Sequence, residues 1–165
     1  PEVDLRPASL RAIVDDIFWL NRETCAARGI ALRWERCDEV GAIPMDAQLI
    51  EQALLNVVKN AIEAVQARQM LGVPGGHVRV TLEAQGNEVV LAVLDSADLL
   101  GEVAPRQLFT PFFTTKRGGQ GIGLMFVREV LNRHGFAYAL GATGQGETRF
   151  EIRFSTTACA AAVSA

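Results

Sequence analysis

The first residues whose types and spacing could do chemistry form a polar stripe along the amphipathic segment 46–65. Its members recur at intervals of three and four, as neighbours on one helix face do: Gln52, Asn56, Lys59, Asn60 and Glu63. A solvated helix face explains the glutamine, the lysine and the glutamate. The two asparagines need another explanation, because asparagine is a weak helix former whose side chain competes for the backbone. Amide oxygens suit a hard cation such as Mg²⁺, which takes few protein ligands beside substrate phosphates.

A second candidate is the glycine-rich segment from Gly119 to Leu124, which precedes or opens a helix. Its backbone N–H groups can approach an anion closely, and a helix N-terminus adds about half a positive charge, so the segment fits a phosphate chain. The flanking residues match neither a Walker loop nor a dinucleotide-binding fingerprint. Lys116 either pairs with a terminal phosphate as a mobile point charge or is an exposed loop lysine.

The third candidate is Asp95, which ends the apolar run from Val89 to Leu94. A carboxylate at the carboxyl end of a central strand either caps the next turn or accepts hydrogen bonds from a ligand at that end of the sheet. An adenine amino group is a suitable donor, since a hydrogen bond to a buried charge contributes roughly 1.5–3 kcal/mol. Both roles stay open for Asp95.

Helices and strands that would position these residues can be read from the hydrophobic periodicity. The 3.6-residue period predicts helices from Leu10 to near Gly29, from an N-cap at Asp46 to a break at 72–76, and from about Leu124 to His134. Alternation and apolar runs predict strands near 30–34, 78–82, 89–94, 137–140 and 149–154, with a turn at 41–44. The order predicts an α+β fold, a two-layer sandwich in which about three helices cover one face of a mixed, roughly five-stranded sheet.

Four of these segments together resemble the ATP-binding catalytic domain of sensor histidine kinases, within the Bergerat-type ATPase superfamily that includes gyrase. Residues 46–61 are similar to the family's asparagine box, and 108–116 (LFTPFFTTK) to the phenylalanine box of nitrogen-sensing-type kinases. Residues 119–124 are similar to the second glycine box, and 146–150 to the last element, Gly-x-Thr-x-Phe. The four motifs stand in the family's order, and the resemblance covers residues 5 to 154.

The resemblance implies a Bergerat-type ATP-binding fold with ATP and Mg²⁺ as cofactors. It implies that Asn60 and Asn56 hold Mg²⁺ and that Asn56 and Lys116 are the catalytic residues. The residues implied to contact ATP are Asn56, Lys59, Asn60, Asp95, Ala97, Phe112, Thr115, Lys116, Gly119, Gly121, Ile122, Gly123, Leu124 and Thr148.

Asn56 also discriminates within the superfamily, because gyrase-like hydrolases carry there a glutamate that activates water. An amide takes up no proton at neutral pH, so transfer of the γ-phosphoryl group to a separate acceptor fits better than hydrolysis. The resemblance therefore implies a protein-histidine kinase fragment. Its partners would be a dimerisation domain of the same parent protein, which carries the acceptor histidine, and a response regulator. His77 and His134 lack the acidic residue that follows family acceptors, and we expect both to be structural, His134 as a cation at a helix C-terminus.

The sequence departs from the family at the first glycine box, Asp-x-Gly-x-Gly. Here residues 95–99 read Asp-Ser-Ala-Asp-Leu, and if position 97 or 99 needs positive φ, a side chain there costs on the order of 1–2 kcal/mol. Two further hypotheses therefore stay open. One is a degenerate domain that binds nucleotide weakly and acts as a protein-interaction module. The other is an anti-sigma-type kinase that phosphorylates a protein serine.

Composition limits the remaining classes. The 165 residues carry 16 Lys and Arg against 19 Asp and Glu, a net charge of −3 without a basic footprint for nucleic acid. No apolar run reaches the roughly 18–20 residues of a membrane span, so we expect no direct membrane contact by this segment. The three cysteines are widely spaced and suggest no disulfide framework, so we expect a cytoplasmic location. That location includes the cytoplasmic part of a membrane-bound sensor. We expect one domain, 1–154, with a flexible C-terminal tail, 155–165, cut from a longer protein.

Overall fold

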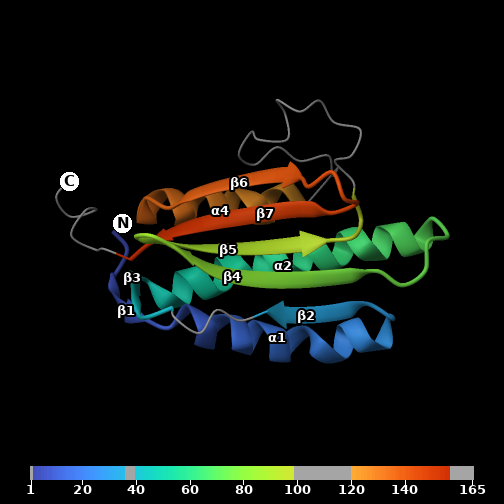
Figure 1. Cartoon of the computed structure of the whole chain (residues 1–165), viewed down its shortest axis with the longest axis horizontal. Helices are drawn as coiled ribbons and strands as arrows, with labels where there is room; N and C mark the ends of the chain where they lie inside the picture. The colour runs from blue at the N-terminus through green and yellow to red at the C-terminus, as the bar shows by residue number, and fades with distance from the viewer. Residues whose placement is uncertain (1, 36–39, 99–119, 157–165) are drawn as a thin grey trace.

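Five strands form one mixed sheet in the computed structural model, which describes residues 2–35, 40–98 and 120–156. The spatial order is β2-β4-β5-β7-β6 (Figure 1), where β2 runs parallel to β4 and all other neighbours are antiparallel. The strands are β2 (Ala31–Glu35), β4 (His77–Gln85), β5 (Glu88–Asp95), β6 (Ala137–Ala142) and β7 (Thr148–Ser155). The predicted strands are confirmed, and β4 and β5 form a hairpin.

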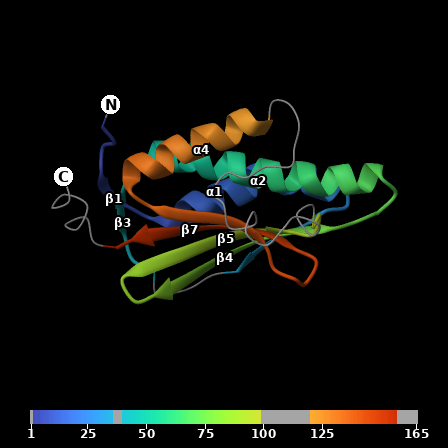
Figure 2. The ribbon, with the colours of Figure 1, turned by 90° about the horizontal axis from the view of Figure 1, so that it is seen from above.

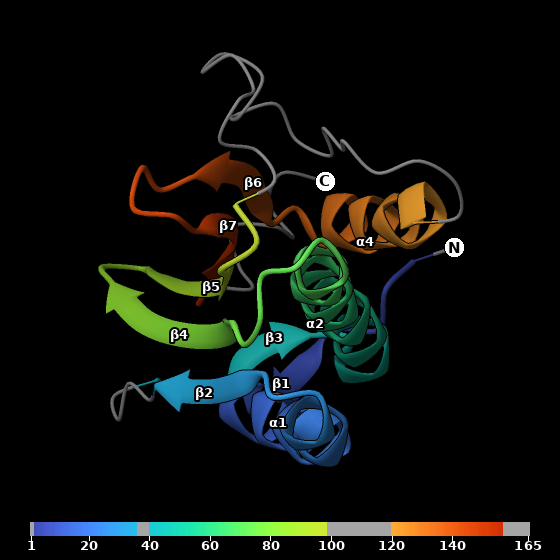
Figure 3. The ribbon, with the colours of Figure 1, turned by 90° about the vertical axis from the view of Figure 1, so that its right-hand side faces the viewer.

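Three helices of the described residues cover one face of this sheet (Figure 2), which confirms the predicted α+β sandwich. They are α1 (Leu10–Ala27), α2 (Ala47–Met70) and α4 (Gln120–His134). Seen from its end, α2 lies between the other two helices (Figure 3). Its apolar stripe is buried from Ile50 to Val65, so burial of this one helix face supplies much of the core. None of the described helices is both long and apolar enough to cross a bilayer.

Local signals set the ends of the first two helices. Ser9 caps α1 through its hydroxyl, which accepts a hydrogen bond from the Ala12 N–H, and Gly29 follows the helix in the left-handed conformation (φ +69°). Asp46 caps α2 as predicted, because its Oδ1 accepts a hydrogen bond from the Leu49 N–H at 3.4 Å. Each such cap is worth about 1 kcal/mol.

A second, two-stranded sheet of β1 (Arg6–Ala8) and β3 (Ile43–Met45) was not expected from the sequence. The predicted turn at 41–44 is therefore wrong for its last two residues. Three-residue strands are too short to show alternation, and Pro7 lies opposite Pro44, each without an N–H for a ladder. The full burial of Ile43 and Met45 holds this short pair against the core.

The last strand extends beyond the predicted domain end at residue 154. β7 includes Ser155, and the N–H and hydroxyl of Thr156 both donate to the carbonyl of Asn87, at 3.0 and 2.9 Å. The tail predicted over 155–165 thus begins with two residues fixed to the β4–β5 turn. Residues 157–165 lie outside the described part of the chain.

Gly76 is a glycine that the fold requires, at the entrance to β4. Its φ is +105°, and a Cβ there would lie 2.5 Å from Val65 Cγ1 on α2 and 2.9 Å from Ser96 Oγ. Its carbonyl also accepts a hydrogen bond from the Ala31 N–H at the start of β2. The loop 72–76 can therefore pass between α2 and the end of β5 only without a side chain at this position.

We predict that Gly76→Ala lowers the free energy of unfolding by about 2–4 kcal/mol, because backbone strain adds to overpacking against Val65. The matched control is Gly86→Ala, which also has positive φ (+62°) but open space around its Cβ, so only about 1 kcal/mol should be lost. Denaturant titration of both variants measures this. Equal losses in the two variants would show that the contact with Val65 carries no cost.

His134 ties the end of α4 to the start of α2, and the prediction that it acts as a cation is wrong. It is 4% exposed, and its Nε2 accepts a hydrogen bond from the Asp46 N–H at 3.0 Å. Its Nδ1–H donates to the Val130 carbonyl at 2.7 Å, which fixes the neutral tautomer. Burial lowers the pKa of His134 below its usual value, against the smaller opposing effects of the Val130 carbonyl and Asp46.

Stability should therefore fall as the solution is acidified. The unfolded chain takes up a proton on this histidine near pH 6.5, whereas the folded protein resists it, so the free energy of unfolding should decrease as the pH drops below about 6.5. Urea titrations across this range measure the slope. A His134→Gln variant should flatten it, and an unchanged slope in this variant would contradict the assignment.

Candidate functional site

The polar stripe of α2 divides into two groups. Asn56 and Asn60 are half-buried, whereas Gln52, Lys59 and Glu63 are exposed, as expected for a solvated helix face. Asn56 lies toward α4, because a Cβ built on Gly123 would be 3.7 Å from its Oδ1. Asn56 is therefore placed at the edge of α2 that borders α4, and Asn60 lies one turn further along the same helix face.

The glycine segment opens α4 rather than preceding it. The helix begins at Gln120, so Gly121, Ile122 and Gly123 lie in its first turns, and the expected start near Leu124 was four residues too late. Each glycine destabilises a helix by about 1 kcal/mol relative to alanine, so a segment with two glycines was not predicted to be helical. Leu124 is buried and anchors this end of α4 in the core. The first N–H groups of the helix have no partner within the helix, which is the usual anion-binding arrangement.

Asp95 and Thr148 are directly paired residues of β5 and β7 at one end of the sheet. Both are buried, at 7% and 9% exposure. Asp95 Oδ1 accepts a hydrogen bond from the Ala97 N–H at 3.0 Å, so this carboxylate does cap the turn after β5. Thr148 Oγ1 has no hydrogen-bond partner among the described residues. A buried hydroxyl without a partner costs about 1–3 kcal/mol, so the pair is suited to a ligand that supplies the missing hydrogen bond.

The replaced first glycine box fits its backbone without the expected strain at position 97. Ala97 does not have positive φ; its methyl group is in the core at 1% exposure. The positive φ (+52°) belongs to Asp98, a residue type that tolerates the left-handed region better than most. The predicted cost of a side chain at 97 therefore does not arise, and Leu99 lies outside the described residues.

Four residues of the predicted set fall in the segment for which no placement is described. They are Phe112, Thr115, Lys116 and Gly119. The other predicted residues come from α2, from the β5 end, from the start of α4 and from the start of β7. In two views, the N-terminal end of α4 and the Asp95 end of β5 lie toward the same end of the domain (Figure 1, Figure 2).

One polar cluster next to this site was missed by the sequence analysis. Glu147, which precedes Thr148, is 7% exposed and accepts hydrogen bonds from Arg79 and His77 of β4. The Arg79 guanidinium, together with the His77 ring, lowers the pKa of Glu147 to about 2. The expectation that His77 is structural agrees with this contact. The cluster depends on the spatial order of strands that are 68 to 70 residues apart, which no local pattern in the sequence reveals.

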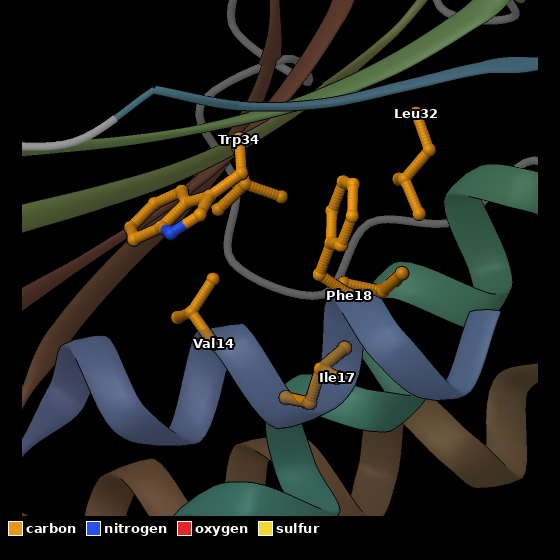
Figure 4. A pocket seen from close by; sticks show the side chains of 7 residues that line it. Val14, Ile17, Phe18, Leu32 and Trp34 are labelled. Carbon is orange, nitrogen blue, oxygen red and sulfur yellow. The ribbon is translucent and has the colours of Figure 1, made fainter. Parts of the chain in front are cut away.

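A small apolar pocket between α1 and β2 is separate from these residues (Figure 4). It is lined by Val14, Ile17, Phe18, Leu32, Trp34, Val58 and Val80, and its volume is about 10 Å³. A volume of that size is about one water molecule, and its apolar lining offers water no partner. The pocket is a packing defect between helix and edge strand rather than a ligand site.

Comparison with known proteins identifies the family of this domain. Residues 45–158 match the family described as histidine kinase-, DNA gyrase B- and HSP90-like ATPases. The chain belongs to this family. The matched range holds α2, the sheet from β4 to β7 and α4, which together carry the described candidate residues.

Relatives of this chain include a sensor histidine kinase and a nitrogen regulation protein. The chain is 30% identical to the sensor histidine kinase ZraS of Escherichia coli O157:H7 over 148 residues, 90% of this chain and 31% of ZraS. It is 32% identical to the nitrogen regulation protein NtrY of Azorhizobium caulinodans over 61% of this chain and 13% of NtrY. The chain thus spans less than a third of the length of either relative.

Solved structures show the same fold. The catalytic domain of the histidine kinase ThkA superposes with a TM-score of 0.75 at 26% identity, covering 93% of this chain and 97% of that domain. A structure of ThkA in complex with the response regulator protein TrrA contains the same fold, with a TM-score of 0.74 at 24% identity, covering 94% of this chain and 42% of that chain. The predicted resemblance to histidine kinase catalytic domains is confirmed.

The ATPase domain should not gain stability from a glycine restored at position 97. We predict that Ala97→Gly lowers the free energy of unfolding by about 1–2 kcal/mol, because a buried methyl group is lost and the unfolded chain gains freedom. Asp98→Gly should instead be neutral or stabilising by up to about 1 kcal/mol, since it relieves the left-handed residue. Thermal and denaturant unfolding measure both changes. Stabilisation by Ala97→Gly would contradict the ordinary φ of Ala97.

Proposed function

We propose that this domain binds Mg²⁺–ATP between α2 and α4 and presents the γ-phosphoryl group to a histidine on a separate dimerisation domain. The buried pair of Asp95 and Thr148 carries the proposal, because its hydroxyl has no hydrogen-bond partner among the described residues and its carboxylate can accept from the adenine amino group. Membership of an ATPase family supports ATP as the ligand.

The polyphosphate would lie along the start of α4. There the N–H groups of the first turns, including those of Gly121, Ile122 and Gly123, and the helix dipole favour negative charge. Gly119, Lys116, Phe112 and Thr115 lie outside the described residues, and the resemblance alone supports them as further nucleotide contacts.

The metal would be held by the side-chain oxygens of Asn60 and Asn56, whose half-buried places beside α4 fit a cation shared with phosphate oxygens. Bound Mg²⁺ would neutralise charge on the phosphates. Lys59 is exposed and directly precedes Asn60 in the sequence, so it would add a positive charge near the bound nucleotide.

Phosphoryl transfer to a partner fits better than hydrolysis. Asn56 offers an amide where a hydrolase needs a base, so no side chain at this position can deprotonate water. Transfer needs mainly alignment and charge neutralisation, which the helix N-terminus, Lys116 and the Mg²⁺ held by the amides would supply. The relatives named as sensor histidine kinases support a histidine as acceptor, and the ThkA complex supports a response regulator as the further partner.

The two other hypotheses have less support. A degenerate interaction module rested on the lost glycines, and Ala97 now fits its backbone without strain. A serine kinase of the anti-sigma type has less support, because relatives such as ZraS are named as sensor histidine kinases.

Isothermal calorimetry of this chain with ATP and Mg²⁺ tests the proposal. We expect Asn60→Ala to weaken Mg²⁺–ATP binding about tenfold or more, because one metal ligand is lost, while binding of ATP in EDTA changes much less. Gln52→Ala, an exposed polar residue of the same helix, is the matched control and should leave both affinities unchanged. Phosphate-release assays should show negligible hydrolysis by the chain alone.

Absence of nucleotide binding at millimolar ATP would overturn the proposal and favour the interaction module. Rapid release of phosphate by the chain alone would contradict the role assigned to Asn56.

A further inference from the structure

Glu147 joins two strands that are not neighbours, on the sheet face opposite the helices. Its Oε1 accepts from Arg79 Nη2 at 2.9 Å, and its Oε2 accepts from Arg79 Nε at 2.9 Å and from His77 Nε2–H at 2.7 Å. Arg79 and His77 belong to β4, whereas Glu147 leads into β7, and β5 lies between them. The cluster therefore clamps β4 to β7 across the end of β5.

The backbone of His77 is fixed to the residue that follows Asp95. The His77 N–H donates to Ser96 Oγ at 2.8 Å, and the Ser96 N–H donates to the His77 carbonyl at 3.1 Å. His77 is thus bound to Ser96 by its main chain and to Glu147 by its side chain. Ser96 follows Asp95, and Glu147 precedes Thr148. His77 therefore connects the residues next to Asp95 and Thr148 in the sequence.

The entry to β7 is also held through its backbone, because the Glu147 carbonyl accepts hydrogen bonds from the Thr143 N–H at 3.0 Å and from the Thr143 hydroxyl at 3.3 Å. The segment between these two residues contains two glycines. Gly144 and Gly146 both have positive φ (+81° and +82°), and a Cβ on either would meet no atom within 4 Å. A segment with such glycines has wide conformational freedom in the absence of side-chain anchors. The bidentate arginine contact of Glu147 is the type of interaction that fixes orientation as well as distance.

We propose that Glu147, held by Arg79 and His77, is a positioning residue that sets the distance and orientation of Thr148 relative to Asp95 and thereby determines preference for adenine. The inference rests on the proposed nucleotide site. Glu147 and Thr148 are successive residues of an extended chain, so their side chains project to opposite faces of the sheet. The clamp acts on the ligand through the backbone and does not touch it.

The experiment compares the affinity of this chain for Mg²⁺–ATP and Mg²⁺–ITP, whose base carries an oxo group where adenine has its amino group. Wild-type protein should prefer ATP about tenfold or more, because an oxo group cannot donate to Asp95. In Glu147→Gln, ATP affinity should fall about fivefold to tenfold while ITP affinity changes less than about twofold, so the preference narrows. Calorimetry gives both dissociation constants.

Glu151→Gln is the matched control, because Glu151 lies on β7 and accepts from Arg149 and Arg153, which belong to the same strand. It should keep the wild-type preference. His77→Gln retains a side-chain donor, so its preference for ATP over ITP should be nearer to that of the wild type than the preference of His77→Ala. If Glu147→Gln fails to fold, the two His77 variants test the clamp instead. Circular dichroism establishes the folded fraction of each variant.

If Glu147 only stabilised the fold, its substitution would reduce the fraction of folded protein. The affinities for ATP and ITP would then fall by the same factor, and their ratio would not change. That result, or an unchanged ratio in both Glu147→Gln and His77→Ala, would overturn the positioning role while leaving the nucleotide site in place. Failure of wild-type protein to bind either nucleotide would instead overturn the proposed function itself.

Discussion

Burial of one face of α2 is the constraint on which the rest of the domain depends. The helix is 24 residues long, and its apolar stripe lies on the sheet between α1 and α4. Because the buried face is fixed, the angular positions of all other α2 residues are fixed too. Asn56 and Asn60 consequently lie at the α4 edge of the helix, while Lys59 and Glu63 reach solvent. The placement of the two asparagines is thus a consequence of core packing.

Much of the architecture could be predicted from the sequence because it rests on local signals. The period of α2, its Asp46 cap and the uninterrupted apolar run of β5 each identify an element by themselves. β5 has no alternation because it is the central strand and is buried on both faces. The pair of β1 and β3 could not be predicted, since it is short, contains prolines and exists only through contacts 37 residues apart, as between Pro7 and Pro44. The start of α4 was not predicted, because its glycines disfavour a helix locally and the helix there is stabilised by tertiary packing.

The site shows the same division. The positions of Asn56, Asn60 and Asp95 follow from periodicity and strand ends, which are visible in the sequence. The neutral state of His134 and the clamp on Glu147 were not visible, because each depends on a partner 68 to 88 residues away. The local rule that a histidine in the last turn of a helix carries charge was overridden by burial and by the Asp46 N–H as donor.

The hydrogen bond between His134 and Asp46 also has a mechanical consequence. It fastens the C-terminal end of α4 to the N-cap of α2, whereas the opposite end of α4 begins with glycines beside Asn56. From Gly123 to His134 the helix spans about 16 Å. The two ends of α4 are thus held by different contacts. The hydrogen bond of His134 to the N-cap of α2 fixes the end far from Asn56, and the burial of Leu124 in the core holds the end next to Asn56.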